Sequence, residues 1–326
     1  MGSEAKKDSG MPKTIPDPAD YIVPLNMNGL QGRMLHMPAK KTGTGPGSNR
    51  EILFVYGHHS SLERWWGLML NLNKYAAVTM PDLPGFGGMD SFYKIGKEAT
   101  LDNLADYLAS FVKLRYKRKR LIIVGMSLGF VIATRMLQRY PELSKKVDML
   151  VSFAGFAHHD DFTFSKPRMT AYLTGARLFS LPGASGFFRH VCLNSHILRT
   201  VYRHTNNAKD KFKDVHGEEL ERLLEFEVRL WHDNDVRTYM KTTVEFLTLD
   251  NCKKQVDLPV YHIAVDADRY FNNVIVEQHM SVIFKEFHLL ANLKIGNHAP
   301  SVIADAKSAA PFIPPKMRRI LSTYAK

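Results

Sequence analysis

The stretch Leu121–Phe130, LIIVGMSLGF, decides which fold the chain adopts. It opens on a continuous apolar run, which is typical of a strand buried on both faces. Gly125 and Gly129 flank Ser127, and glycine permits the tight turn and close packing that a strand needs when it passes directly into a helix. The pattern Gly-x-Ser-x-Gly therefore predicts a sharp turn that exposes the Ser127 hydroxyl. The Leu128 amide then lies at a helix N-terminus, where it can stabilise an oxyanion.

The elements on either side of this turn support the motif. In a chain with 21 glycines, a pentapeptide of this form also arises by chance, so its context must confirm it. The strand Leu121–Val124 precedes the turn, and helical spacing follows from Val131 to Tyr140, where Pro141 ends it. Strand, tight turn and helix are the context that a nucleophilic serine at such a turn requires.

Apolar runs alternate with helical patterns over much of the chain. Leu101–Leu114, for example, has the apolar spacing of a helix. This alternation predicts an α/β fold with a mostly parallel central sheet and helices on both faces. The remaining strand candidates are Tyr21–Met27, Gly32–Met37, Ile52–Tyr56, Ala76–Met80, Met149–Phe153, Val260–Val265 and Leu293–Ile295.

The alternation stops between residues 157 and 257, where only helical patterns are found. These are Ser195–His204, Glu218–Trp231 and Val236–Leu249. A helical insertion between two strands of the sheet explains this order. We therefore predict a flexible lead-in over 1–20, a core made of 21–156 and 258–326, and a helical cap over 157–257.

The composition is that of a globular protein, with 45% hydrophobic and 23% charged residues. Cys192 and Cys252 lack the spacing of a disulfide framework or a zinc site. The glycine-rich segment within the loop Ala39–Arg50 lacks the Gly-Lys-Ser/Thr ending of a phosphate-binding loop. We expect no cofactor and no metal. Because the first residues have no apolar signal region, we also expect a cytoplasmic protein.

The net charge of +12 invites the question of an anionic partner. The densest basic cluster is Lys113–Arg120, and it precedes the strand at Leu121. No nucleic-acid-binding motif accompanies it, so we expect no nucleic acid partner. The cluster is interpreted as a solvated loop, and a contact with an anionic surface through it stays open.

From about residue 50 to its C-terminus, the chain resembles the α/β-hydrolase family of serine hydrolases with a helical cap. The segment Tyr56-Gly57-His58-His59-Ser60-Ser61 stands where the family has its oxyanion loop, with Tyr56 in place of the frequent histidine. The resemblance implies that the backbone N–H of His58 is the second oxyanion donor. A metal interpretation of the two histidines lacks a third ligand at suitable spacing. The turn Pro81–Gly87 resembles a structural turn of the family.

The resemblance also implies a triad acid and a triad histidine in the order serine, acid, histidine. The segment Pro259–Asp268 resembles the family's late strand and acid loop, and aligning it implies that Asp268 is the acid, with Asp266 non-catalytic. A family variant with its acid after the sixth strand leaves Asp160 or Asp161 as alternatives.

The general base is expected in the loop after the last strand, where the sequence Ile295–Pro300 contains His298. His288 lies upstream of the predicted last strand and is expected on a surface helix.

The predicted reaction is the hydrolysis of a carboxylic ester through an acyl-enzyme on Ser127. The stretch Phe162–Phe188 is rich in aromatic and aliphatic residues, which suits a small substrate with an apolar acyl or alcohol group, although these residues can equally form the cap's own core. Carbon–carbon bond hydrolysis, thioester hydrolysis and a small aminopeptidase activity use the same triad and remain alternatives. So does a non-catalytic binding protein on this fold. The oligomeric state stays open.

Overall fold

The computed structural model describes residues 16–39, 50–204, 216–266, 268–295, 298, 305–307 and 309–324. Most of the predicted lead-in over 1–20 lies outside these residues, as does nearly all of the loop Ala39–Arg50. At its N-terminal end the described chain begins with a short 3-10 helix, Pro18–Tyr21, which is followed by the first strand.

The centre of the described structure is an eight-stranded sheet in the order β1-β2-β4-β3-β5-β6-β7-β8. The two pairings that involve β2 are antiparallel, and the other neighbours run parallel, as expected for connections made through helices. The strands are β1 (Ile22–Met27), β2 (Leu30–Met37), β3 (Arg50–Val55), β4 (Ala77–Pro81), β5 (Arg120–Met126), β6 (Val147–Phe153), β7 (Val256–Val265) and β8 (Phe284–Leu293).

Helices follow the strands and cover the sheet. The α-helices are α1 (Trp66–Leu72), α2 (Leu101–Arg115), α3 (Leu128–Arg139), α4 (Lys166–Phe179), α5 (Pro182–Phe187), α6 (Ser195–His204), α8 (Gly217–Asp233), α9 (Val236–Leu247), α10 (Asn273–Ile283) and α11 (Pro315–Tyr324). Short helical turns are η3 (Glu63–Trp65), η4 (Phe92–Ile95), η5 (Pro141–Lys146), η6 (His159–Asp161), η7 (Phe188–Cys192) and η8 (Ala310–Phe312). None of the helices in this described part of the chain has both the length and the apolar character that crossing a bilayer demands.

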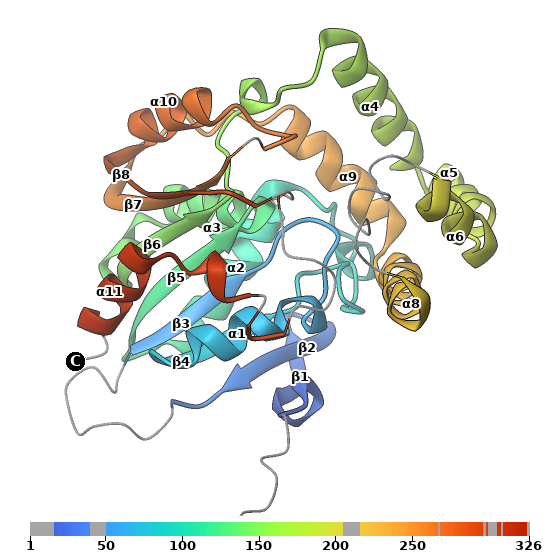
Figure 1. The fold of residues 1–326 in the computed structure, drawn as a ribbon. Helices are drawn as coiled ribbons and strands as arrows, with labels where there is room; N and C mark the ends of the chain where they lie inside the picture. Colours follow the sequence, from blue (N-terminus) through green and yellow to red (C-terminus); the bar gives the residue numbers. More distant parts are fainter. Residues whose placement is uncertain are drawn as a thin grey trace, which may run out of the picture.

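The arrangement of the sheet and its helices confirms the predicted α/β architecture. α1 and α11 lie on one face of the sheet and α2 and α3 on the other (Figure 1). The central strands β3 to β6 are almost wholly buried, so their continuous apolar runs have partners on both faces. Helices α4 to α9, which connect β6 to β7, gather beyond one end of the sheet, at the right of Figure 1.

One strand differs from the sequence prediction. The last strand is Phe284–Leu293, so it ends where the predicted strand Leu293–Ile295 begins. β8 is the edge strand, and its buried and exposed residues are mixed along its length. A search for continuous apolar runs therefore misses it. His288 lies on this strand and stacks on Tyr261 at a ring-centroid distance of 4.9 Å, so its expected place on a surface helix is wrong.

A polar network behind the β3 and β4 ends explains Tyr56, which departs from the family pattern. The Tyr56 hydroxyl donates to Asp82 Oδ1 at 3.0 Å and accepts the Leu83 N–H at 2.7 Å. Arg33 donates through Nε to Asp82 Oδ2 at 3.2 Å and through Nη1 to Glu63 at 2.7 Å. Asp82 is fully buried, and its carboxylate is satisfied by these two donors.

We expect Tyr56→Phe to lower the free energy of unfolding by about 1–3 kcal/mol, because it leaves a buried carboxylate and a buried amide each one hydrogen bond short. Urea denaturation measures the change. Tyr140→Phe is the matched control, since the Tyr140 hydroxyl donates to the partly exposed carboxylate of Asp106. We expect that control to change stability by less than about 0.5 kcal/mol. Equal losses in the two variants would contradict this account.

Candidate active site

Ser127 occupies a strained turn between β5 and α3. Its φ is 49° and its ψ is −118°, a region that side chains other than glycine seldom adopt. The Ser127 N–H donates to the Phe153 carbonyl of β6 at 2.9 Å, which fixes the turn to the neighbouring strand. The turn predicted from the sequence is present.

The two flanking glycines are required by close backbone approaches. A Cβ on Gly125 would lie 2.5 Å from Phe130 Cα, and one on Gly129 would lie 2.1 Å from the Val55 carbonyl oxygen. Both distances are shorter than any ordinary carbon contact. The glycines therefore let α3 fold back over β5 and pack against the end of β3.

His298 lies between Ser127 and Asp268. Its Nε2 is 3.1 Å from Ser127 Oγ, and its Nδ1 is 2.7 Å from Asp268 Oδ2. With Nδ1–H donating to the carboxylate, the lone pair of Nε2 faces the serine hydroxyl. The structure thus brings together the serine, the acid and the histidine named from the sequence.

The Asp268 carboxylate is held by more than the histidine. Its side chain is only 2% exposed, and Oδ1 accepts the Tyr270 N–H at 2.8 Å. The rings of Tyr270 and Phe271 both meet His298 edge-on at 5.3 Å. Asp266, by contrast, is exposed at the end of β7, outside this arrangement.

The alternative acids are engaged elsewhere. Asp161 is fully buried, and its Oδ2 accepts the N–H groups of Ala157 and His158, while its Oδ1 lies 2.6 Å from His279 Nδ1. Asp160 is 67% exposed and lies beside its neighbouring histidines. Asp161 thus stabilises the start of η6 and contacts His279, whereas Asp268 is the carboxylate that contacts His298.

The loop at Gly57–Ser61 passes directly over the Ser127 turn. A Cβ on Gly57 would lie 3.2 Å from both Met126 O and Ser127 Cβ, so this position favours glycine. The loop is fixed by the Trp65 indole, which donates to Ser60 Oγ at 2.6 Å, and by Arg64, which donates to the His59 carbonyl at 3.1 Å. The His58 backbone is therefore held beside the serine.

The His58 side chain has a role that sequence reasoning did not find. Its Nε2 lies 3.0 Å from Thr242 Oγ1 and 3.2 Å from the Tyr239 carbonyl, and both residues are on α9. Burial lowers the pKa of His58 to about 4, so the imidazole is neutral near pH 7. The ring fastens the loop to a helix that follows it by more than 170 residues, a pairing without any local sequence signal.

Ser127 and His298 open into a cavity of about 850 Å³. One wall is the loop at Gly57–His59, and the other walls include residues of α4, α6, α8 and α9, of the turn η7, of the segment that follows β6 and of the Asp268 loop. Rings predominate on these walls: Phe156, Phe162, Phe164, Tyr172, Phe179, Phe188, Trp231, Tyr239, Phe246, Tyr270 and Phe271. The polar exceptions include Arg64 and the buried Glu227, which accepts the Tyr202 hydroxyl at 2.9 Å.

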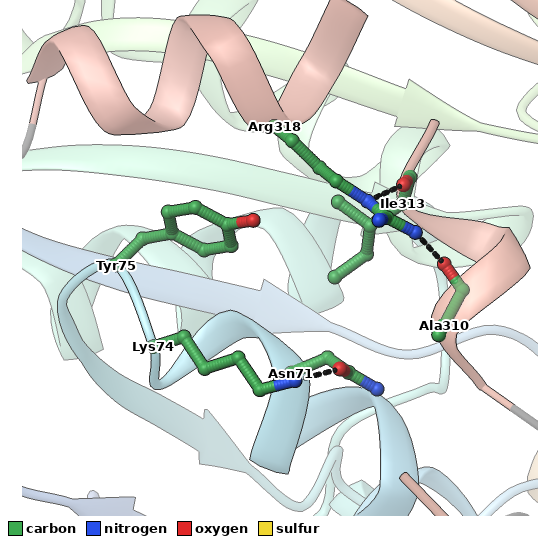
Figure 2. Close-up of a pocket in the computed structure, with 6 residues that line it drawn as sticks. All are labelled: Asn71, Lys74, Tyr75, Ala310, Ile313 and Arg318. Atoms are coloured by element: carbon green, nitrogen blue, oxygen red, sulfur yellow. Dashed lines mark hydrogen bonds between the residues drawn. The ribbon is translucent and has the colours of Figure 1, made fainter. Parts of the chain in front are cut away.

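A second, much smaller pocket of about 80 Å³ lies between α1 and the segment η8–α11. Figure 2 shows that its cations serve the packing around it: Arg318 donates to the carbonyls of Ile313 and Ala310, and Lys74 donates to Asn71. It has room for little more than water and is structural.

Among the described residues, one group could hold a metal ion: His158, His159 and Asp160, whose ligand atoms lie within 4.8 Å of one another. His158 Nδ1, however, already accepts the Asp160 N–H at 3.1 Å. A metal would have to displace that bond, and the exposed Asp160 is poorly held. We assign no metal to this group.

Comparison with known proteins gives a family-level match. The model of the family described as alpha/beta hydrolase fold matches residues 51–213. Two relatives are named pimeloyl-[acyl-carrier protein] methyl ester esterase. The one from Wigglesworthia glossinidia brevipalpis is 24% identical over 193 residues, which cover 58% of this chain and 69% of that protein. The one from Pseudoalteromonas atlantica is 25% identical over 135 residues, and the chain spans about half of its length (49%, and 41% of this chain).

Among solved structures, an esterase from Exiguobacterium antarcticum superposes with a TM-score of 0.62 over 91% of this chain and 97% of that one. The sequence identity is 12%. A likeness at that identity establishes the shared fold, and a fold alone does not identify a reaction.

Two buried histidines make stability depend on pH. Burial lowers the pKa of His262, which contacts Ser152 Oγ at 2.9 Å, to about 4, as it does for His58. The unfolded chain binds these protons near pH 6.5. Between pH 6.5 and 4 it therefore holds more protons than the folded chain, so stability is greatest above this range and falls as the pH is lowered through it.

We expect each of the two histidines to lower the free energy of unfolding by about 2 kcal/mol when the pH falls from 7.5 to 5. His262→Gln should reduce this loss of unfolding free energy between pH 7.5 and pH 5 by roughly the contribution of one histidine. The expectation holds whatever the substitution does to stability at pH 7.5. Urea denaturation at the two pH values measures it. The control is His288→Gln, whose side chain is 42% exposed. An unchanged pH difference in the His262 variant would contradict the assignment.

Proposed function

Because the chain belongs to the α/β hydrolase fold family, we propose that it hydrolyses carboxylic esters through an acyl-enzyme on Ser127. The observation that carries this proposal is the line of contacts from Ser127 Oγ through His298 to Asp268. A serine, histidine and carboxylate in this geometry are the minimum that an activated serine nucleophile needs.

In the first step, Ser127 Oγ attacks the ester carbonyl carbon while His298 Nε2 takes its proton. The carboxylate of Asp268 stabilises the imidazolium that forms and keeps Nδ1 protonated. When the tetrahedral intermediate collapses, the carbon–oxygen bond to the alcohol breaks. The alcohol leaves with the proton held on Nε2, and the acyl group stays on Ser127.

The negative oxygen of the intermediate needs two donors. The Leu128 N–H is one, because it lies in the first turn of α3 and has no intrahelical acceptor. The His58 N–H is the other, on the loop held against the serine turn. Removing one donor of this kind typically costs about 10²–10³ in rate.

Water completes the cycle. His298 takes a proton from a water molecule, and the resulting oxygen attacks the acyl carbon. Collapse of the second intermediate breaks the bond to Ser127 Oγ, which regains its proton from Nε2. The carboxylic acid product is released and the serine is free again.

The cavity indicates the substrate class. Its aromatic lining favours an apolar acyl or alcohol group, and its volume suits a small molecule. The relatives named as esterases support an ester as the reacting bond. An oxygen ester with an apolar group of modest size is therefore the proposed substrate.

Ser127→Ala should reduce ester hydrolysis to background, with a loss of at least about 10³ in kcat/KM, and should abolish labelling by a fluorophosphonate probe. The measurement is turnover of a short apolar ester, with mass spectrometry of the labelled protein. Ser110→Ala is the control, because this serine lies on α2 away from the cavity lining and its hydroxyl donates to the Asp106 carbonyl of the same helix. Activity that survives in the Ser127 variant would refute the mechanism. Absence of labelling in folded wild-type protein would favour a non-catalytic binding protein.

Asp268→Asn should lower kcat by about 10³–10⁴ with little change in KM, because the amide no longer fixes the protonated Nδ1 of His298. Asp161→Asn tests the alternative acid. We expect it to lower stability more than kcat/KM, since Asp161 caps η6. A collapse of activity in the Asp161 variant, with Asp268→Asn active, would reverse the assignment.

A panel of esters with increasing acyl length should show kcat/KM rising with chain length until the cavity is filled. Each oxygen ester is paired with the thioester of the same acid, which separates the proposed reaction from thioester hydrolysis. A preference for the thioester at every length would overturn the proposed substrate class and leave the serine mechanism intact.

A further inference from the structure

The segment Phe162–His204, which includes α4, α5 and α6, contains no aspartate or glutamate. At the chain's average it would contain about four. It does contain six cationic residues: Lys166, Arg168, Arg177, Arg189, Arg199 and Arg203. This part of the surface is therefore positive without local compensation from its own sequence.

The same segment exposes large apolar side chains. Each of them is between 42% and 60% exposed, although α-helices of globular proteins usually turn such residues inward. We call this set the apolar cap edge: Leu178, Leu181, Phe187, Val191, Ile197 and Val201. The elements α4, α5 and η7 pack on one another in that order, and exposed apolar surface that extends over neighbouring helices usually marks an interaction site.

Packing against the rest of the protein does not explain the apolar residues of this edge. On α6, Leu198 is buried and Tyr202 half-buried, whereas Ile197 and Val201, one turn apart, face outward. On α4, only Ala176 is buried. Figure 1 shows α4, α5 and α6 at the outer side of the helical region, with α8 and α9 nearer the sheet.

We propose that the apolar cap edge docks on an anionic lipid surface. Exposed apolar side chains enter the boundary of the acyl chains, and lysine and arginine around them are attracted by the negative headgroups. No carboxylate of the segment itself opposes such docking, and on the neighbouring α8 the exposed Glu221 is paired with Arg199.

A second copy of this chain fits the edge less well. A symmetric dimer through this face would bring the cations of both copies into one interface. A closely packed interface would have to bury them without carboxylate partners from the same segment.

The basic cluster at Lys113–Arg120 is a weaker candidate for such a surface, because four of its six cations pair within the fold and Leu114 is its one exposed large apolar side chain. Lys113 pairs with Glu142 at 3.0 Å, Arg115 and Lys119 pair with Glu51, and Arg120 pairs with Asp148. In the described structure Arg199 pairs with Glu221, and Lys166, Arg168 and Arg177 form no ion pair.

Docking at this edge would also present the cavity to the lipid. Arg168 and Tyr172 on α4 line the cavity and are exposed at the same time. The Arg168 guanidinium lies 4.6 Å from the Phe164 ring centre, where it can meet a headgroup without leaving its aromatic support. An apolar ester that partitions into the lipid would then have a short path to the cavity.

Vesicle flotation tests the proposal with full-length protein and without turnover. We expect binding to phosphatidylcholine vesicles that contain about 30% phosphatidylglycerol, weak binding to pure phosphatidylcholine, and loss of most binding in about 0.5 M salt. The variants Leu181→Ser and Phe187→Ser should each lower the partition coefficient about tenfold. Neither residue lines the cavity, so hydrolysis of a water-soluble ester should stay unchanged and report correct folding.

Two control variants locate the surface. Val274→Ser removes an apolar residue that is 66% exposed on α10, and Lys117→Glu reverses a charge in the other basic cluster. Both should bind vesicles like the wild type, whereas Arg177→Glu should bind several-fold more weakly.

Binding lost equally in the controls would overturn the proposal, as would failure of the wild type to float with anionic vesicles. A concentration-dependent dimer that light scattering detects in the wild type and not in Phe187→Ser, without vesicle binding, would assign the edge to a second copy instead. Because flotation needs no ester cleavage, each of these failures is distinguishable from failure of the proposed hydrolysis.

Discussion

The close packing of α3 over the ends of β3 and β5 is the constraint on which the site depends. Ser127 can stay at φ 49° only because the turn is over-determined by its neighbours, including the bond from its N–H to Phe153. Gly125 and Gly129 make that packing sterically possible. The strain aims the hydroxyl outward and puts the Leu128 amide at the start of a helix. The proposed nucleophile and the proposed oxyanion donor are therefore products of one backbone arrangement.

The parts of this architecture with short-range causes could be predicted from the sequence. The β5 strand, its turn and α3 follow from an apolar run, two glycines and helical spacing within one segment. β8 could not be found in this way, because an edge strand with Lys285, Glu286 and His288 exposed or half-exposed shows no continuous apolar run. Predicting its place required knowledge of the neighbouring strand.

The candidate site likewise combines features with a local sequence signal and features that depend on contacts between distant segments. Asp268 and His298 were named through resemblance and order along the chain, and no periodicity in the sequence places them within hydrogen-bonding distance of each other. The contacts of Asp161 with Ala157 and His279 depend on tertiary structure, so the sequence alone left that carboxylate as an alternative acid. Contacts between distant segments depend on the whole fold, and a single sequence carries little information about them.

The attachment of His58 to α9 limits how the helical region can move. If α9 lifted away from the sheet, it would pull on the His58 ring through Tyr239 and Thr242 and shift the backbone that adjoins Ser127. The part of the cavity wall that α9 supplies is therefore coupled to the loop beside Ser127. A displacement of α9 would therefore disturb the cavity wall and the backbone beside Ser127 together.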